Sequence, residues 1–306
     1  MRVAFAGTPE FAATILRTLA ASGHDVRLVV SQPNTRRGRG RKVRPTPVAR
    51  LALDLELPLR QPARISEVAG EISAQEALVV AAYGQILRPD TLYAAREGAW
   101  NVHASLLPKY RGAAPIERAI MAGERETGVT IIRMDEGLDT GPMASQRSVE
   151  IPPDMTGGEL ARLLAEVGAK AIVEVLRQIE SGEVNLTEQN SLHATYAPKL
   201  SDEDLEIQWE AGAGEVANLV RALSPYLGAR TFHSGVDGPV KIWRARVARE
   251  ADSSLEPGVI RTENDRLFVG CGVGVLEVLE LQMPGGRRLP AQDYLRGNAL
   301  EGAFYW

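Results

Sequence analysis

The sequence predicts an α/β protein with a doubly wound, mostly parallel sheet, followed by a smaller β-barrel. Up to about residue 180, short apolar runs alternate with segments of helical period, a pattern typical of parallel sheets covered by helices. From residue 208 onward, short strand signals are separated by Gly, Pro and Asn-Asp turns. A chain of 306 residues is also long for one domain. We therefore expect a Rossmann-like domain at residues 1–189, a linker at 190–207 and an OB-like barrel at 208–306.

The elements of the first domain have simple signals. The apolar run at residues 3–6 predicts a first strand, and residues 9–23 predict a helix because their large apolar side chains recur three or four positions apart. A second strand follows, and then a helix with Pro47 in its first turn. Further apolar runs predict strands at residues 77–84, 99–103 and 128–134.

The later elements differ in how strongly they are specified. Thr156 and Glu159 have capping-box spacing, and the apolar residues after them form one stripe, which predicts a long helix packed on the sheet. The segment from about residue 181 shows no sustained period and is expected to connect the two domains. Strands of the barrel are expected within residues 239–247, 257–285 and 287–295.

Composition and motifs argue against several classes of protein. Cys271 is the only cysteine, so neither an intramolecular disulfide nor a cysteine-cluster metal site is possible, which suits a reducing cytoplasm. No apolar stretch approaches the roughly 20 residues of a membrane span. The turn GTPEFAA after the first strand lacks Gly-x-Gly-x-x-Gly, which argues against a dehydrogenase. We expect a cytoplasmic protein without a membrane partner, a metal or NAD.

One short segment departs from the overall charge. The chain carries a net charge of −4, yet six of the nine residues from Arg36 to Arg44 are Arg or Lys. Gly38 and Gly40 would allow this loop to bend. A solvated charge run that serves solubility is the simplest interpretation. A partner with closely spaced phosphates is the alternative.

Two polar residues lie at the end of the strand predicted at residues 99–103. Asn101 and His103 are two positions apart, so their side chains face the same side of the strand. Ligands of open α/β sheets bind at the carboxyl ends of strands. An amide can stabilise an oxyanion and an imidazole can move a proton at neutral pH, which suits acyl-group chemistry. A lone histidine that satisfies a polar strand end is the simpler alternative.

The segment MDEGLDTGPM adds acids just after the strand 128–134. Asp139 lies in a tight Leu-Asp-Thr-Gly turn and is expected to orient or charge-stabilise His103, with Asp135 as the competing candidate. Asp-Thr-Gly also occurs in aspartic proteases, but these need two carboxylates that share a proton, and the motif occurs once here. We expect Asn101, His103 and Asp139 to share one cleft.

Taken in order, several motifs resemble those of the methionyl-tRNA formyltransferases, a family of folate-dependent enzymes. The block NVHASLLPKYRGAAPI is the most specific of them, and the likeness runs from residue 3 to about residue 205. The other motifs are FAGTPEFAA, SQP, GRGRK, PTPV, AAYGQIL, ETGVTIIRMDEGLDTGPM and YAPKLSDED. The glycine-containing cationic loop and the C-terminal domain point to the enzyme that acts on tRNA.

The resemblance implies an activity and its residues. The formyl group of 10-formyltetrahydrofolate would pass to the α-amino group of methionyl-initiator-tRNA, giving N-formylmethionyl-tRNA for translation initiation. Asn101, His103 and Asp139 would be catalytic, and either His103 or Asp139 would accept the amine's proton. Folate would be bound by Ser105, Leu106, Leu107, Pro108, Gln85, Ile86 and Leu87. The tRNA would be bound by Arg36, Arg37, Arg39, Arg41 and Lys42, with Arg39 as the residue that inserts, and the C-terminal barrel would also bind tRNA.

Two rival interpretations stay open at this point. A folate-dependent formyltransferase that acts on glycinamide ribonucleotide or on an amino-sugar nucleotide would share Asn101, His103 and Asp139 without needing the cationic loop. A non-catalytic RNA-binding protein would need the loop but not the histidine. Because the expected active-site residues all come from one chain, we expect a monomer.

Overall fold

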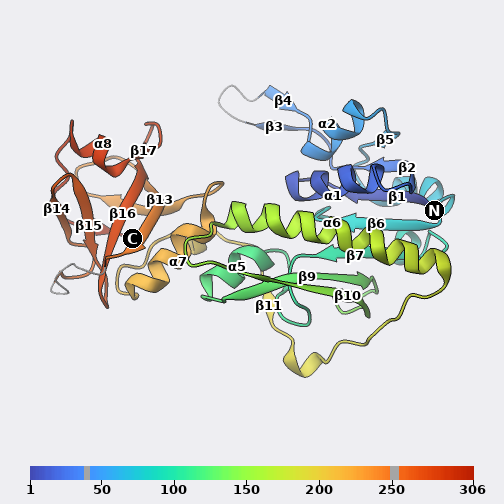
Figure 1. Ribbon diagram of the computed structural model, residues 1–306. Helices are drawn as coiled ribbons and strands as arrows, with labels where there is room; N and C mark the ends of the chain where they lie inside the picture. The colour runs from blue at the N-terminus through green and yellow to red at the C-terminus, as the bar shows by residue number, and fades with distance from the viewer. Residues whose placement is uncertain (38–41, 249–254) are drawn as a thin grey trace. The chain divides into compact units, whose positions relative to one another are not determined.

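The computed structural model describes residues 1–37, 42–248 and 255–306 (Figure 1). These residues form two compact units. The first consists of residues 1–112, 126–150 and 161–197, and the second of residues 113–125, 151–160 and 198–306. The predicted domain bounds, 1–189 and 208–306 with a linker between them, stay a prediction.

A seven-stranded sheet forms the centre of the first unit. Its strands lie in the order β10-β9-β7-β6-β1-β2-β5, and the five from β7 to β5 are parallel, as the sequence predicts. The strands are β1 (Arg2–Gly7), β2 (Asp25–Val30), β5 (Leu59–Arg60), β6 (Ala77–Ala81), β7 (Ala99–His103), β9 (Glu126–Arg133) and β10 (Met143–Glu150).

Helices cover both faces of this sheet. One face packs against η1 (Ile65–Val68), α3 (Ala69–Ser73) and α4 (Pro89–Leu92) through a shared apolar cluster. On the other face, α6 (Gly157–Ser181) approaches closely, because a Cβ added to its Gly168 would lie 2.6 Å from Cγ1 of Val102. The first unit also contains the helices α1 (Glu10–Ala20) and α2 (Pro47–Asp54).

The predicted start signals of two helices are confirmed. Thr46 caps α2 by accepting a hydrogen bond from Ala49 N at 3.0 Å, and Pro47 is in the first turn. At α6, Glu159 Oε2 accepts from Thr156 N at 2.9 Å and Thr156 Oγ1 accepts from Glu159 N at 3.3 Å. This reciprocal pair is the capping box that the spacing predicts.

The cationic segment begins and ends in two short strands. β3 (Thr35–Arg37) and β4 (Lys42–Arg44) pair antiparallel, with Arg37 opposite Lys42. A hairpin stem therefore brings the ends of the basic run together, where the sequence indicated only a loop. Arg39 and Arg41 lie outside the described residues.

The second unit contains a barrel-like antiparallel sheet, as predicted. Its main path runs β14-β15-β16-β13-β12-β18, and β17 pairs with β16. The two ends of the path meet at the Val259–Ala303 bridge, where Ile260 N donates to Gly302 O at 2.9 Å. The strands are β12 (Ala229–His233), β13 (Val240–Val247), β14 (Ile260–Glu263), β15 (Arg266–Gly270), β16 (Val275–Gln282), β17 (Leu289–Pro290) and β18 (Phe304–Tyr305).

The core of this barrel is closed by one helix and two stacked aromatic rings. α7 (Ala213–Leu223) contributes Val216, Val220 and Leu223 to the buried cluster. Trp209 and Phe304 stack with ring centroids 5.9 Å apart. The other helices of the second unit are α5 (Pro115–Met121), η3 (Glu203–Leu205) and α8 (Ala291–Leu295).

Two segments contain more than the sequence indicated. Residues 287–295 hold the expected short strand, β17, and then the helix α8, which begins directly after Pro290. The segment after residue 181 connects the units, yet it contains η2 (Ser191–His193) and β11 (Tyr196–Ala197). β11 pairs in parallel with β8 (Arg111–Gly112). Among the described residues, no helix is long and apolar enough to cross a membrane.

Candidate active site

The site is built on β7, which carries two of the three expected residues. Val102 faces α6, so alternation along the strand directs Asn101 and His103 to the opposite face. His103 is the last residue of β7, at the carboxyl end of the parallel part of the sheet. The position is the one that the sequence predicts for a ligand site.

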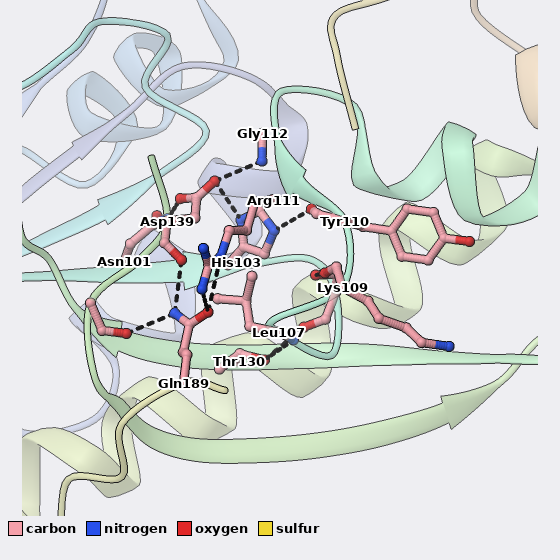
Figure 2. A network of polar contacts seen from close by, with 12 residues as sticks. Asn101, His103, Leu107, Lys109, Tyr110, Arg111, Gly112, Thr130, Asp139 and Gln189 are labelled. Carbon is pink, nitrogen blue, oxygen red and sulfur yellow. Dashed lines mark hydrogen bonds and ion pairs between the residues drawn. The ribbon is translucent and has the colours of Figure 1, made fainter. Parts of the chain in front are cut away.

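Asp139 reaches these residues by a route that the sequence does not suggest. β9 is antiparallel to β7, with Trp100 opposite Arg133, so the carboxyl end of β9 lies beside the amino end of β7. Asp139 follows its strand, as expected, but the end of that strand lies at the opposite edge of the sheet from His103. Instead, the loop between β9 and β10 returns Asp139 to Asn101, and Figure 2 shows the two side chains next to each other.

Three groups surround the carboxylate of Asp139 (Figure 2). Asn101 Nδ2 donates to Oδ1 at 3.3 Å, and Gly112 N donates to Oδ2 at 2.8 Å. His103 Nδ1 lies 3.6 Å from the same Oδ2. The side chain of Asp139 is 13% exposed, so these contacts act with little screening by water. The structure thus brings Asn101, His103 and Asp139 together, as predicted.

The turn that carries Asp139 is held in an unusual conformation. Asp139 has φ of +54°, in the left-handed region that costs energy for a residue other than glycine. Asp135, the competing acid, braces this turn: its Oδ1 accepts hydrogen bonds from Thr140 Oγ1 at 2.6 Å and from Gly137 N at 3.1 Å. Asp135 is thereby used within its own loop, and Asp139 is the acid that faces the histidine.

His103 is nearly buried, with 5% of its side chain exposed. Nε2 lies 2.9 Å from the carbonyl oxygen of Tyr110, and a carbonyl can only accept, so Nε2 carries a hydrogen and donates it. Nδ1 then faces the carboxylate of Asp139. The imidazole is therefore fixed in orientation, with Nδ1 directed at the carboxylate of Asp139.

A network of polar groups fixes the loop that supplies Tyr110. Thr130 Oγ1 donates to Ser105 O at 2.7 Å and accepts from Leu107 N at 3.1 Å. Gln146 Nε2 donates to Leu107 O at 2.7 Å. These contacts tie the loop after β7 to β9 and β10, so the carbonyl that holds His103 rests on a rigid base.

The residues expected to bind folate differ in how accessible they are. Ser105 and Leu107 are buried, while Leu106 and Pro108 are partly buried. Ile86 is 91% exposed, whereas Leu87 belongs to the apolar cluster beneath the sheet. The side chain of Gln85 is used within the protein: Oε1 accepts from Ile65 N and Nε2 donates to Ala63 O, both at 3.0 Å.

Sequence reasoning missed the backbone groups of the site. The Gly112 N–H and the Tyr110 carbonyl each hold a predicted side chain, but any residue type carries such groups, so no sequence signal marks them. Thr130 is different, because a buried hydroxyl inside the apolar strand GVTIIR is a visible exception to the pattern.

This arrangement can stabilise an anion and move a proton. An amide donor, an imidazole and a carboxylate meet at the end of a strand, which is suited to attack on a carbonyl carbon by a neutral nucleophile. Among the residues that the structure describes, no group of three or more His, Cys, Asp or Glu side chains could hold a metal ion.

Comparisons with known structures agree with this fold. HypX from Aquifex aeolicus, in complex with tetrahydrofolic acid, has a TM-score of 0.68 at 18% identity, over 96% of this chain and 47% of HypX, so this chain spans about half of HypX. The N-formyltransferase from Helicobacter canadensis, bound to folinic acid and dTDP-3-aminofucose, has a TM-score of 0.68 at 17% identity, over 90% of this chain and 98% of that one.

Comparisons of sequence identify the family. The model described as "Formyl transferase" matches residues 1–176, and that of "Formyl transferase, C-terminal domain" matches residues 199–299. The methionyl-tRNA formyltransferase of Rubrobacter xylanophilus is 68% identical over 303 residues, 99% of each chain. That of Pelotomaculum thermopropionicum is 44% identical over 306 residues, covering 98% of this chain and 96% of the relative. With both family models and full-length relatives in agreement, this chain belongs to the methionyl-tRNA formyltransferase family of formyl transferases.

Proposed function

We propose that this chain transfers the formyl group of 10-formyltetrahydrofolate to the α-amino group of methionyl-initiator-tRNA. The observation that carries the proposal is the meeting of Asn101, His103 and Asp139. It occurs in a chain that is 68% identical to a relative named methionyl-tRNA formyltransferase. The N–C bond of the new formamide forms while the bond from the formyl carbon to N10 of the folate breaks. One proton leaves the amine and one is gained by N10, so the reaction balances.

Asn101 stabilises the tetrahedral intermediate. Its amide nitrogen carries two hydrogens, and one of them points at Asp139 Oδ1, which leaves the other for the oxyanion of the attacked formyl group. Because Asp139 fixes the amide, the donor is already oriented when the charge develops. The role of Asn101 is therefore to hold a hydrogen at the place where negative charge appears.

His103 and Asp139 manage the proton of the amine as a pair. Nε2 of His103 is held by the Tyr110 carbonyl, so only Nδ1 can share a proton with Asp139 Oδ2. The pair takes the proton from the attacking amine through the carboxylate or a bridging water, and returns one to N10. The separation of 3.6 Å suits an electrostatic pair that tightens when the proton arrives.

The folate site is proposed on the loops beside this pair. Ile86 and the partly buried Leu106 and Pro108 are available for apolar contact with the pterin. Ser105 and Leu107 support the loop from inside, while Gln85 and Leu87 fix the neighbouring loop on which Ile86 stands. Enzymes of this family use folate, and the 10-formyl form is the one whose chemistry matches the site.

The cationic hairpin is proposed as the tRNA contact of the first unit. Arg36, Arg37 and Lys42 belong to the β3–β4 stem, and their positive charge favours binding to phosphates. Arg39 and Arg41, which lie outside the described residues, complete the set, with Arg39 proposed to contact a base. The second unit is also proposed to bind tRNA. Its Arg246 forms an ion pair with Glu277 at 2.7 Å, so this arginine is less available to bind RNA than its charge suggests.

A formyl-transfer assay over three acceptors tests the proposal. Charged initiator tRNA should be formylated, while glycinamide ribonucleotide and an amino-sugar nucleotide should give no product. His103→Ala should lower kcat by about 10²-fold or more, and His103→Gln should do the same while keeping a donor for the Tyr110 carbonyl. His193→Ala, at an exposed histidine, is the matched control and should keep full activity.

Two outcomes would contradict the proposal. If initiator tRNA gave no product and another acceptor did, the substrate would be wrong. If both His103 variants kept the wild-type rate, the site would be wrong, and an RNA-binding function without catalysis would be favoured. We further propose a monomer, because Asn101, His103 and Asp139 come from one chain; light scattering of the purified protein tests the mass. A cytoplasmic location is proposed because the single cysteine suits a reducing compartment.

A further inference from the structure

A buried arginine and a glutamine form a clamp beside the site. Arg111 directly follows Tyr110 in the chain and is only 3% exposed. Its Nε and Nη2 both donate to Oε1 of Gln189, at 3.1 and 2.7 Å. Gln189 lies beyond α6, in the segment that the sequence indicated as a plain connection. The two residues are far apart in the chain and adjacent in the fold (Figure 2).

The amide of Gln189 is fully used by this arrangement. Its Nε2 donates to the carbonyl oxygens of Asp139 and Gly141, both at 2.8 Å. With Oε1 accepting twice from Arg111, the side chain makes four hydrogen bonds, which is the full capacity of an amide. A surface glutamine that merely covers a loop would not need this set of partners.

The clamp acts on Asp139 from two directions. Gln189 holds the backbone of the turn whose residue Asp139 has φ of +54°. On the other side it holds Arg111, and the next residue, Gly112, donates its N–H to Asp139 Oδ2. The side-chain amide of Gln189 therefore connects the backbone of Asp139 to β8, the strand whose Gly112 donates to the Asp139 carboxylate.

We propose that Gln189 is a positioning residue that sets the place of the Asp139 carboxylate relative to His103 and Asn101. Gln189 holds a conformation that is strained for aspartate, and it keeps Oδ2 toward His103 Nδ1. It acts through Asp139 and does not touch the substrate. The inference deepens the proposed function and rests on it.

The surroundings allow this role to be separated from a general structural one. The segment of Gln189 is tied to the first unit by independent contacts: Tyr110 N donates to Thr195 Oγ1 at 2.9 Å, and β11 pairs with β8. Loss of the Gln189 donors should therefore leave the chain folded and the segment in place. What changes is the turn around Asp139.

The first test is Gln189→Glu, which keeps the size of the side chain and an acceptor for Arg111 but removes both donors to the turn. A carboxylate would face the carbonyl oxygens of Asp139 and Gly141, which should displace the turn. We expect kcat to fall about 10- to 100-fold, as small misplacements of a reacting group do, with the KM values for folate and tRNA changed less than about threefold. Gln178→Glu, at an exposed position of α6, is the matched control and should leave kcat unchanged.

A double-mutant cycle with Asp139→Asn distinguishes positioning from structure. If Gln189 acts only through the carboxylate, then in an Asp139→Asn background Gln189→Glu should change kcat by less than about twofold. A full multiplicative effect in that background, or a wild-type kcat for the single variant, would overturn the inference. Gln189→Met, measured in the same cycle, gives the same decision if Gln189→Glu lowers the unfolding temperature. If the wild-type protein itself formylates no initiator tRNA, the proposed function fails first.

Discussion

The carboxylate of Asp139 is held by three different groups. Asp139 lies in the left-handed region and meets an amide, a backbone N–H and an imidazole within 3.6 Å. Each contact restricts a different motion: Asn101 fixes Oδ1, while Gly112 and His103 fix Oδ2. A free aspartate could adopt many rotamers, whereas these contacts restrict Asp139 to one. The carboxylate is therefore already oriented before a substrate binds.

At this scale we predict the effect of removing Asn101, the proposed oxyanion donor. Asn101→Ala should lower kcat about 10²- to 10³-fold, the cost typical of losing one preorganised donor. Folate affinity should change little, because the donor acts mainly on the charge that appears in the transition state. Single-turnover formylation at saturating substrate measures the step directly.

The matched control for this change is Asn185→Ala, at an exposed asparagine of the same unit. It should retain the wild-type rate. A rate for Asn101→Ala within about threefold of wild type would show that the amide does not meet the developing charge.

Sequence reasoning predicted that the three side chains meet, but it did not find the groups that support them. Asn101 and His103 share a face because strands alternate, and this could be predicted from two letters in a strand. The meeting with Asp139 was predicted for a partly wrong reason, because β9 is antiparallel. The clamp of Gln189 could not be predicted, since its partners are backbone carbonyls and a residue 78 positions away.

At the scale of elements, the short pair β8–β11 decides how the backbone of Gly112 meets the site. Gly112 has φ of +120°, and a Cβ there would lie 2.7 Å from the carbonyl oxygen of Ala197. Only glycine satisfies both conditions. The pairing of these strands and the N–H donated to Asp139 therefore depend on the same missing side chain.

We predict that Gly112→Ala lowers both stability and turnover. The methyl group should push β11 away, which costs roughly 1–3 kcal/mol of unfolding free energy and shifts the N–H away from Asp139. Thermal unfolding and kcat measure the two effects. Gly70→Ala is the control, because it lies in α3 at an ordinary φ with no heavy atom within 4 Å of the added Cβ. Equal unfolding temperatures for wild type and Gly112→Ala would contradict the steric argument.

Elements were predictable where their own pattern was strong. The capping box located the start of α6, and alternation located β13. α7 was missed although Val216, Val220 and Leu223 recur at helical spacing, so this signal was present and overlooked. β10 was also missed, because its side chains are partly exposed and polar, and its place depends on pairing with β9.

A row of residues across the barrel gives a prediction about pH. In this row Arg246, Glu277, Phe268 and Arg261 lie opposite one another on four adjacent strands. Hydrogen bonds from Arg266 first, and from Arg246, lower the pKa of the buried Glu277 carboxyl from 4.5 to about 2. Because the folded pKa lies below the ordinary one, this carboxylate stabilises the fold fully above about pH 5 and loses its contribution as the pH falls toward 2.

Glu277→Gln should therefore destabilise the second unit at neutral pH by about 1–2 kcal/mol, since both arginines stay half exposed after the change. The difference from wild type should shrink near pH 4. Urea unfolding followed by tryptophan fluorescence measures it, because Trp209, Trp243 and Trp306 all lie in this unit. Glu210→Gln, at an exposed position, should show no such difference. A loss of stability that is equal at both pH values would refute the ionic origin.

At the scale of the whole molecule, the distribution of charge is more informative than its sum. The net charge of −4 disfavours general binding to nucleic acid, while six cations within nine residues concentrate attraction at one hairpin. The sequence could predict this contrast but not the stem, because β3 and β4 are joined by backbone groups that every residue type carries.

We predict that tRNA affinity falls steeply with salt and that the slope reports the hairpin. Replacing Arg37 and Lys42 together by Gln should reduce the slope of log K against log salt by about 0.7–0.9 for each phosphate contact that is lost. Folate affinity should not change, because the stem carries none of the residues proposed to contact folate. Arg17→Gln, at an exposed position of α1, is the control and should keep the wild-type slope. A slope that is the same in wild type and in the double variant would mean that the tRNA is held elsewhere on the molecule, with the basic run serving only to keep an acidic protein soluble.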